Sequence, residues 1–261
     1  MIQAHPVQAF SDNYIWLLEA GADAAFVVDP GDAAPVLAAL AARGLQLGGI
    51  LVTHHHADHV GGVAGLLRRC GEVPVYGPRG SPAGEITHPL EDGDRIDVLG
   101  RVAEVLAVPG HTLDHIAYFF AESHGAAPLL FCGDTLFAGG CGRVFEGNPR
   151  MMHASLARLA VLPAATRVYC AHEYTLSNLR FACAVEPRNA QLLRRRQEAE
   201  ALRARGEPTV PSTIALELAT NPFLRCGDTA VRAVAAERCG MELAEQSEVF
   251  AVVRSWKDDY R

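Results

Sequence analysis

Four histidines and an aspartate lie within one six-residue segment of the chain: His54, His55, His56, Asp58 and His59. The whole chain holds 11 histidines in 261 residues, so a window of six should hold roughly a quarter of one. Imidazole and carboxylate groups on a tight loop are ligands for zinc, iron or manganese. We therefore expect this segment to bind metal. We assign no role to His55, because its side chain should alternate away from those of its neighbours.

Three more ligand-type side chains, His111, Asp134 and His172, each follow a predicted strand. Taken singly, each has an ordinary alternative: a histidine in a turn, an aspartate capping a turn, or a histidine that ends a strand. However, four predicted strands end in such residues, and strand-end loops are where a scaffold presents functional side chains. The joint pattern favours one shared metal site.

The elements that must position these residues change in character along the chain. Runs rich in apolar or β-branched residues predict strands over residues 14–19, 25–29, 49–53, 73–77, 102–108, 115–121, 129–132 and 167–170. Helices are predicted over residues 33–43, 60–69 and 155–161. From about residue 173 onward we expect no strand, only helices over residues 176–185, 189–205, 212–219, 229–239 and 247–256. An α/β portion is thus followed by an all-helical portion.

Composition narrows the class of protein. A net charge of −7 without a long basic run argues against a nucleic-acid partner. Seven cysteines without a CxxC pair predict reduced thiols. The N-terminus lacks the pattern of a signal peptide, and no segment has the length of a membrane helix. We expect a cytoplasmic monomer with no membrane partner.

With these motifs the chain resembles the metallo-β-lactamase superfamily. The superfamily loop is matched by His54, His56, Asp58 and His59, and its later ligand positions by His111, Asp134 and His172. Within the superfamily the chain closely resembles the hydroxyacylglutathione hydrolase (glyoxalase II) family. That resemblance rests on segments at residues 11–14, 133–137, 141–143, 168–175, 207–213 and 221–223.

The resemblance implies an αββα sandwich over residues 1–172, the catalytic domain, and a helical substrate-binding domain over residues 173–261. It also implies two divalent metal ions per chain. His54, His56 and His111 would bind one ion; Asp58, His59 and His172 would bind the other. Asp134 would bridge the two ions, and Asp58 would also orient the nucleophile. Zinc is expected first, with iron and manganese as alternatives, because an all nitrogen and oxygen set discriminates weakly among them.

The implied reaction is the hydrolysis of a glutathione thioester, S-D-lactoylglutathione, to glutathione and D-lactate, the second step of methylglyoxal detoxification. A metal-activated hydroxide would attack the carbonyl, and a thiolate leaves without a strong general acid. The resemblance places substrate contacts at Arg143, Phe145, Tyr174, Arg254 and Lys257. The commonest human-type pattern has lysine and tyrosine at the first two positions. Arginine keeps the charge, whereas Phe145 lacks the hydroxyl.

Other interpretations remain open. Arg254 and Lys257 could be an ordinary basic helix end. Another hydrolase of the superfamily, acting on a lactone, lactam or phosphodiester, would have the same metal ligands. A persulfide dioxygenase with a single iron would also act on a glutathione derivative, but it would not need the second ligand set of Asp58, His59 and His172.

Overall fold

The structure, a computed structural model, describes residues 1–21 and 23–260. Its backbone contacts divide the chain into two compact units. The first unit contains Met1–Ala107 and Asp114–Gly133; the second contains Val108–Leu113 and the chain from Asp134 onward. Residues 134–172 thus belong to the second unit. The division of the chain into domains at residue 172 stays a prediction.

One sheet of the first unit has six strands in sequence order. They are β1 (Gln3–Ala9), β2 (Asn13–Glu19), β3 (Ala24–Val28), β4 (Gln46–Leu51), β5 (Val75–Pro78) and β6 (His88–Leu90). The first three strands pair antiparallel, and the pairs from β3 to β6 are parallel. Parallel strands need a crossover between them, and helices supply the first two crossovers.

A second, antiparallel sheet in this unit has the strand order β10 (Leu129–Gly133), β9 (Ile116–Phe120), β8 (Arg101–Ala107) and β7 (Arg95–Val98). Tyr118 on β9 is fully buried, and its hydroxyl donates to the Val52 carbonyl at 2.9 Å. This bond joins the inner faces of the two sheets, and Ile116 N adds a second link to the Thr53 carbonyl at 2.9 Å.

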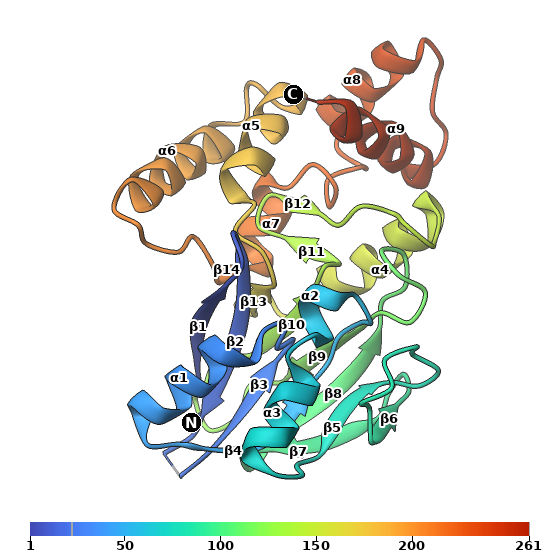
Figure 1. Cartoon of the computed structure of the whole chain (residues 1–261). Coiled ribbons are helices and arrows are strands. Elements are labelled where there is room, and N and C mark those ends of the chain that lie inside the picture. Colours follow the sequence, from blue (N-terminus) through green and yellow to red (C-terminus); the bar gives the residue numbers. More distant parts are fainter. Residues whose placement is uncertain (22, 261) are drawn as a thin grey trace. The chain divides into compact units, whose positions relative to one another are not determined.

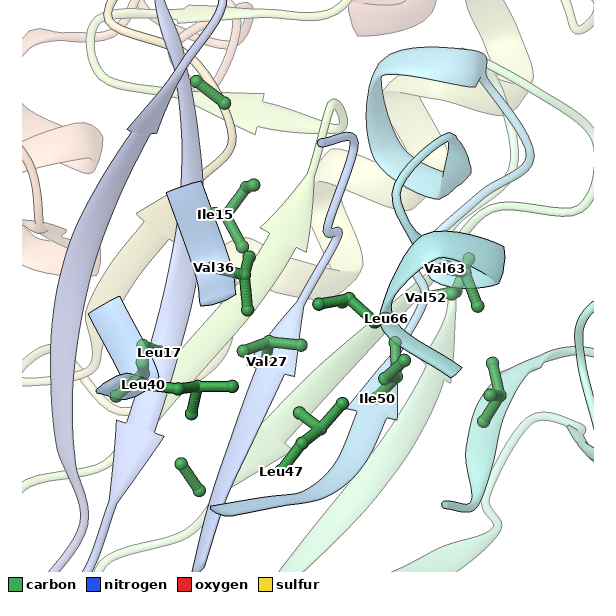
Figure 2. Close-up of a cluster of buried hydrophobic side chains, with 13 residues drawn as sticks. Ile15, Leu17, Val27, Val36, Leu40, Leu47, Ile50, Val52, Val63 and Leu66 are labelled. Carbon is green, nitrogen blue, oxygen red and sulfur yellow. The ribbon is translucent and has the colours of Figure 1, made fainter. Parts of the chain in front are cut away.

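Helices α1 (Ala33–Arg43) and α3 (Val63–Cys70) pack on the outer face of the first sheet (Figure 1). Figure 2 shows Val36 and Leu40 of α1 and Leu66 of α3 directed at buried strand residues. Asp32 caps α1 by accepting a hydrogen bond from Ala34 N, and Gly44 ends the helix in the left-handed conformation. The spacing of apolar residues therefore predicts this helix correctly.

Helix α2 (Ala57–Val60) begins inside the histidine-rich segment. The helix predicted over residues 60–69 is confirmed by α3, but its predicted start is wrong, because Gly61 and Gly62 separate α2 from α3. A Cβ at Gly62 would lie 2.5 Å from the Pro30 carbonyl oxygen. The interruption thus lets the chain pass close to the backbone that follows β3.

The second unit is mainly helical. Its helices are α4 (Pro149–Ala160), α5 (Thr175–Val185), α6 (Ala190–Ala204), α7 (Ile214–Thr220), α8 (Thr229–Cys239) and α9 (Gln246–Asp259). It also contains a short hairpin of β11 (Leu136–Phe137) and β12 (Gly140–Cys141), and the antiparallel pair β13 (Arg167–Cys170) and β14 (Ser212–Thr213). Helix α5 packs on α6, and α9 packs on α4 and α8.

Strand β14 contradicts the expectation that no strand follows residue 173. Its two residues are too few to show the alternation that marks a strand. The helix predicted to begin at residue 212 begins at Ile214, where Thr213 caps it by accepting from Leu216 N. Strands β1, β6 and β7, at the edges of their sheets, also have no counterpart among the predicted strands.

Among the described residues, none of the helices combines the length and the apolar character needed to cross a membrane. All seven cysteines are free thiols, as predicted, and they lie within this described part of the chain.

Candidate metal centre and adjoining pocket

The histidine-rich segment of the first unit is compact and largely buried. His54 and His59 have no exposed surface, and the centres of their rings are 4.0 Å apart. The ring of His56 lies 4.7 Å from that of His54, with Nδ1 of His56 3.0 Å from Nε2 of His54. Asp58 Oδ2 is 3.5 Å from Nε2 of His59. The four predicted ligands of this segment therefore gather in one place.

Asp29, the residue after β3, holds two of these imidazoles. Its carboxylate accepts hydrogen bonds from the Thr53 backbone N–H at 2.7 Å and from the Thr53 hydroxyl at 2.8 Å, and it lies 3.1 Å from Nδ1 of His59. Thr53 Oγ1 in turn lies 3.0 Å from Nδ1 of His54. Partners at Nδ1 fix the ring orientation and leave Nε2 for a metal. Neither Asp29 nor Thr53 was singled out from the sequence as a site residue.

Asp58 has its own support. The amide of Asn13 donates to Asp58 Oδ2 at 3.0 Å, and Asn13 is buried. The backbone beside Asp58 is approached by Gly31, where a Cβ would lie 1.9 Å from the Asp58 carbonyl oxygen. Asn13 belongs to the segment at residues 11–14 on which the family resemblance partly rests, and here it orients a predicted ligand.

His55 has a different partner from its neighbours. Its Nδ1 lies 3.0 Å from Asp114 Oδ1, and the hydroxyl of Ser81 donates to the other Asp114 oxygen at 2.7 Å. His55 thus has a carboxylate partner that is not among the predicted ligands, and its exclusion from the predicted ligand set stays a prediction.

The second unit gathers the other three predicted ligands. Asp134 Oδ2 lies 3.5 Å from Nε2 of His111 and 3.4 Å from Nε2 of His172, and all three residues are buried. Nδ1 of His111 is 2.8 Å from the Arg143 carbonyl oxygen, to which it donates, so Nε2 faces Asp134. The ring of His172 stacks on Tyr174 with centres 4.6 Å apart.

The spacing of these atoms fits a metal ion. Two ligand atoms at 2.0–2.1 Å from one tetrahedral ion lie about 3.3 Å apart. In the first unit the two pairs are 3.0 and 3.5 Å apart; in the second they are 3.5 and 3.4 Å apart. The donors are imidazole and carboxylate groups that suit a divalent metal, and they do not distinguish zinc from iron or manganese.

A pocket of about 490 Å³ in the second unit adjoins two predicted ligands of that unit. It is lined by two predicted ligands and by all five predicted substrate contacts: His111, Asp134, Arg143, Phe145, Tyr174, Arg254 and Lys257. The structure therefore brings together residues that are more than 100 positions apart in the sequence. Their roles stay predictions.

Positive charge dominates one wall of this pocket. Arg254 is buried and donates to the Cys141 carbonyl at 3.1 Å and to Asp258 at 2.9 Å. Lys257 donates to the hydroxyl of Ser177 at 3.3 Å. Partial burial, helped by the nearby charges of Arg254, Arg180 and Arg143, lowers the pKa of Lys257 to about 8. A group of cations held this close together favours an anionic ligand.

Comparisons with known proteins agree on the family. Residues 10–172 match the model of the metallo-beta-lactamase superfamily, and residues 173–260 match that of the hydroxyacylglutathione hydrolase C-terminus. A hydroxyacylglutathione hydrolase of Pseudomonas aeruginosa is 58% identical over 264 residues, and the match covers 100% of each chain. The chain belongs to the hydroxyacylglutathione hydrolase family.

Solved structures of other proteins share this fold. The crystal structure of ETHE1 from Myxococcus xanthus has a TM-score of 0.64 and 25% identity and covers 100% of each chain. That of TTHA1623 in a di-iron-bound form has a TM-score of 0.59 and 30% identity and covers 84% of this chain and 100% of that one. The predicted fold class, a metallo-β-lactamase fold followed by a helical region, is confirmed, and this fold fits a binuclear metal hydrolase.

The pocket of this hydroxyacylglutathione hydrolase family member also has lining residues that were not predicted. They are Phe137, Cys141, Ser177, Asn178, Asp258 and Tyr260. Phe137 and Cys141 belong to segments on which the resemblance rests, but they lie on two-residue strands. Ser177, Asn178 and Asp258 lie on helices, where polar side chains are common and give no chemical signal of their own. Burial raises the pKa of the Cys141 thiol to about 11, so it stays protonated and is not a nucleophile at neutral pH.

Proposed function

We propose that this protein hydrolyses S-(2-hydroxyacyl)glutathione thioesters, with S-D-lactoylglutathione as the first substrate, to glutathione and a 2-hydroxy acid, here D-lactate. This is the second step of methylglyoxal detoxification. The observation that carries the proposal is a pocket in which cationic side chains that suit an anionic peptide lie in the same cavity as two predicted metal ligands. Full-length relatives named hydroxyacylglutathione hydrolase support the choice of substrate.

The proposal assigns two divalent metal ions to the chain, zinc first and iron or manganese as alternatives. His54, His56 and His111 would hold one ion; Asp58, His59 and His172 would hold the other; Asp134 would bridge them. A related structure in a di-iron-bound form supports a pair of ions. When bound, such a pair supplies a hydroxide nucleophile at neutral pH, because it lowers the pKa of water from 15.7 to about 7.

The chain's own residues then orient the reactants. Asn13 holds one oxygen of Asp58, and we assign Asp58 the role of directing the attacking water. Arg143, Arg254 and Lys257 would bind the two carboxylates of glutathione, with Arg143 able to bind one in bidentate fashion. Tyr174 and Phe145 would flank the peptide. The tripeptide is held at its charged ends, so binding energy places the thioester carbonyl at the nucleophile.

The test is an assay of S-D-lactoylglutathione hydrolysis on protein of measured metal content, before and after chelation. We expect about two ions per chain, and activity that is lost with the metal and restored by its return. Activity that survives complete metal removal would exclude the mechanism. Metal-dependent activity on lactones but not on thioesters would exclude the substrate, and oxygen uptake with one iron per chain would favour the dioxygenase.

Two further parts of the proposal are that the protein acts in the cytoplasm and as a monomer. Seven free thiols support a reducing compartment. Fractionation of cells of the source organism and the molecular mass in solution test these two points separately.

A further inference from the structure

We propose that Glu217 and Asn221, with Arg195, are positioning residues that fix the β11–β12 hairpin and, through it, the residues on either side, Asp134 and Arg143. The hairpin spans residues 136–141. The inference rests on the proposed function, since it names what holds two parts of that site in place. None of these three residues lines the pocket.

The hairpin cannot set its own position. Its strands have two residues each, and they form only two residue pairs, Leu136 with Cys141 and Phe137 with Gly140. Even a longer isolated hairpin is marginally stable in water. Contacts with the rest of the second unit must therefore determine where this hairpin lies.

Glu217 on α7 supplies the first of these contacts. Its side chain has no exposed surface, and its Oε2 accepts a hydrogen bond from the Gly139 backbone N–H at 2.8 Å. The other oxygen is bound by the guanidinium of Arg195 and by the hydroxyl of Ser212. A buried carboxylate is costly unless it is paired and fully hydrogen-bonded, and this one is.

Asn221, which follows α7, binds the other side of the hairpin turn. It is also fully buried. Its amide lies 2.9 Å from the Gly140 carbonyl oxygen, 3.3 Å from the Phe137 carbonyl oxygen and 3.0 Å from Glu217 Oε2. Two side chains thus bind three backbone groups at the turn, and Glu217 joins them through its own hydrogen bond with Asn221.

The far end of the hairpin leads into the candidate site. The Cys141 carbonyl accepts from Arg254 at 3.1 Å, and the Arg143 carbonyl accepts from Nδ1 of His111 at 2.8 Å. Between them, Gly142 lies so close to the Asp134 backbone that a Cβ would be 1.9 Å from its carbonyl oxygen. A shift of the hairpin would therefore move a metal ligand and a substrate cation together.

The chemistry of the support explains why polar groups occupy this position. An apolar contact constrains a hairpin only by its shape. A carboxylate that accepts a hydrogen bond from a backbone N–H fixes both the distance and the direction of that N–H group. Arg195 is itself held by the hydroxyl of Thr220 at 2.6 Å. The position of the hairpin is thus tied to α6 and α7, which contribute no residue to the pocket wall.

The experiment compares Glu217→Gln with Glu186→Gln. Glu186 is a matched control because it is also buried in the second unit and paired with an arginine, Arg225, at 2.9 Å, and that arginine is not part of the hairpin. For Glu217→Gln we expect kcat to fall by about 10²-fold and KM to rise, because an error of about 1 Å in position costs this much. Glu186→Gln should keep both constants within about threefold.

A change in KM separates positioning from simple instability, since partial unfolding lowers the active fraction and leaves KM unchanged. The second measurement is amide hydrogen exchange on the metal-free proteins. The peptide that contains Gly139 should exchange faster in Glu217→Gln and at the wild-type rate in Glu186→Gln. Ser212→Ala, a milder change that removes only one hydroxyl from Glu217, should show the same pattern with smaller effects if Glu217→Gln does not fold.

The inference is overturned if the folded Glu217 and Ser212 variants keep wild-type kcat, KM and hairpin exchange. It is also overturned if Glu186→Gln changes them equally. The failure of the proposed function would look different, because the metal-loaded wild-type protein would then not hydrolyse the thioester, whereas the exchange measurement would still report whether Glu217 fixes the hairpin.

Discussion

The two units arrange their predicted site residues in opposite ways. In the first unit the ligand-type residues lie within six consecutive positions, and their nearest supports, Asp29 and Thr53, lie at the ends of adjacent parallel strands. In the second unit residues from His111 to Lys257 meet around one pocket. Residues that lie on one loop need few supporting contacts to keep their positions. Residues that come from distant parts of the chain depend on the position of every helix and strand that carries one of them.

The two units also differ in the contacts that hold these residues in place. The loop is anchored through Thr53, the residue before it, whose backbone N–H and hydroxyl donate to the buried carboxylate of Asp29. The pocket residues are held by backbone carbonyls, such as those of Cys141 and Arg143. A substitution in the loop should therefore remove one predicted ligand and leave the surrounding backbone in place. A substitution near the β11–β12 hairpin should displace several residues at once.

The largest effect should come from the loop itself. His54→Ala removes a buried imidazole whose Nε2 faces His56, and we expect at least ~10³-fold lower kcat/KM, because the nucleophile is no longer generated at neutral pH. The measurement is hydrolysis of S-D-lactoylglutathione together with metal content.

His55→Ala is the matched control for this prediction. It removes the adjacent imidazole, whose Nδ1 lies against Asp114 rather than against a predicted ligand, and should keep activity within about threefold. Equal losses in both variants would show that the loop acts as a general structural element, and the distinction drawn between the two histidines would be wrong.

A smaller loss of activity should follow from adding a methyl group next to predicted site residues of the second unit. In Gly142→Ala the new methyl group would meet the Asp134 carbonyl oxygen at 1.9 Å and His111 Nδ1 at 3.2 Å, so the backbone must shift. We expect kcat/KM to fall by about 10²-fold, since both neighbours belong to the candidate site. Gly84→Ala, with no atom within 4 Å of the added carbon, should stay within about twofold. Wild-type kinetics in Gly142→Ala would mean that the hairpin tolerates displacement.

The same contrast explains what the sequence could reveal. Helix α1 has the predicted bounds, because its apolar spacing, its Asp32 cap and its Gly44 stop all agree. The ligand loop stands out because four histidines in six positions are improbable. Strand β14, with two residues, has no pattern to detect, and its place depends on pairing with β13 from a distant part of the chain.

The supports of the site are harder to predict than its ligands. Asp29 looks like any aspartate that ends a strand, and Glu217 looks like one helical glutamate among many; their roles appear only when the partners are in place. The predicted substrate contacts at Arg143 and Lys257 come from the family resemblance rather than from spacing. Physical chemistry accounts for their charge, but only the fold brings them to one cavity.

A support in the first unit should matter less than a ligand. Asp29→Asn keeps the shape of the side chain but weakens its hold on Nδ1 of His59, and loss of such a partner lowers metal affinity by about 10- to 100-fold. Competition with a chelator of known affinity measures this. Asp32→Asn is the control, because asparagine caps a helix as well as aspartate does, and it should leave affinity unchanged. Unchanged affinity in both variants would show that Thr53 and the fold suffice to orient the ligands.

The smallest effect concerns the charge of the pocket. The pKa of Lys257 is lowered to about 8, so its protonated fraction should fall from about nine tenths at pH 7 to about one tenth at pH 9. An anionic substrate loses a cationic partner as this proton leaves, and KM should rise by up to about tenfold over the interval. Lys257→Arg should flatten the rise, because arginine stays charged throughout. If KM rises equally in the arginine variant, the titrating group is not Lys257. Binding of the anionic substrate would then depend less on this one residue than the close spacing of the pocket's cations suggests.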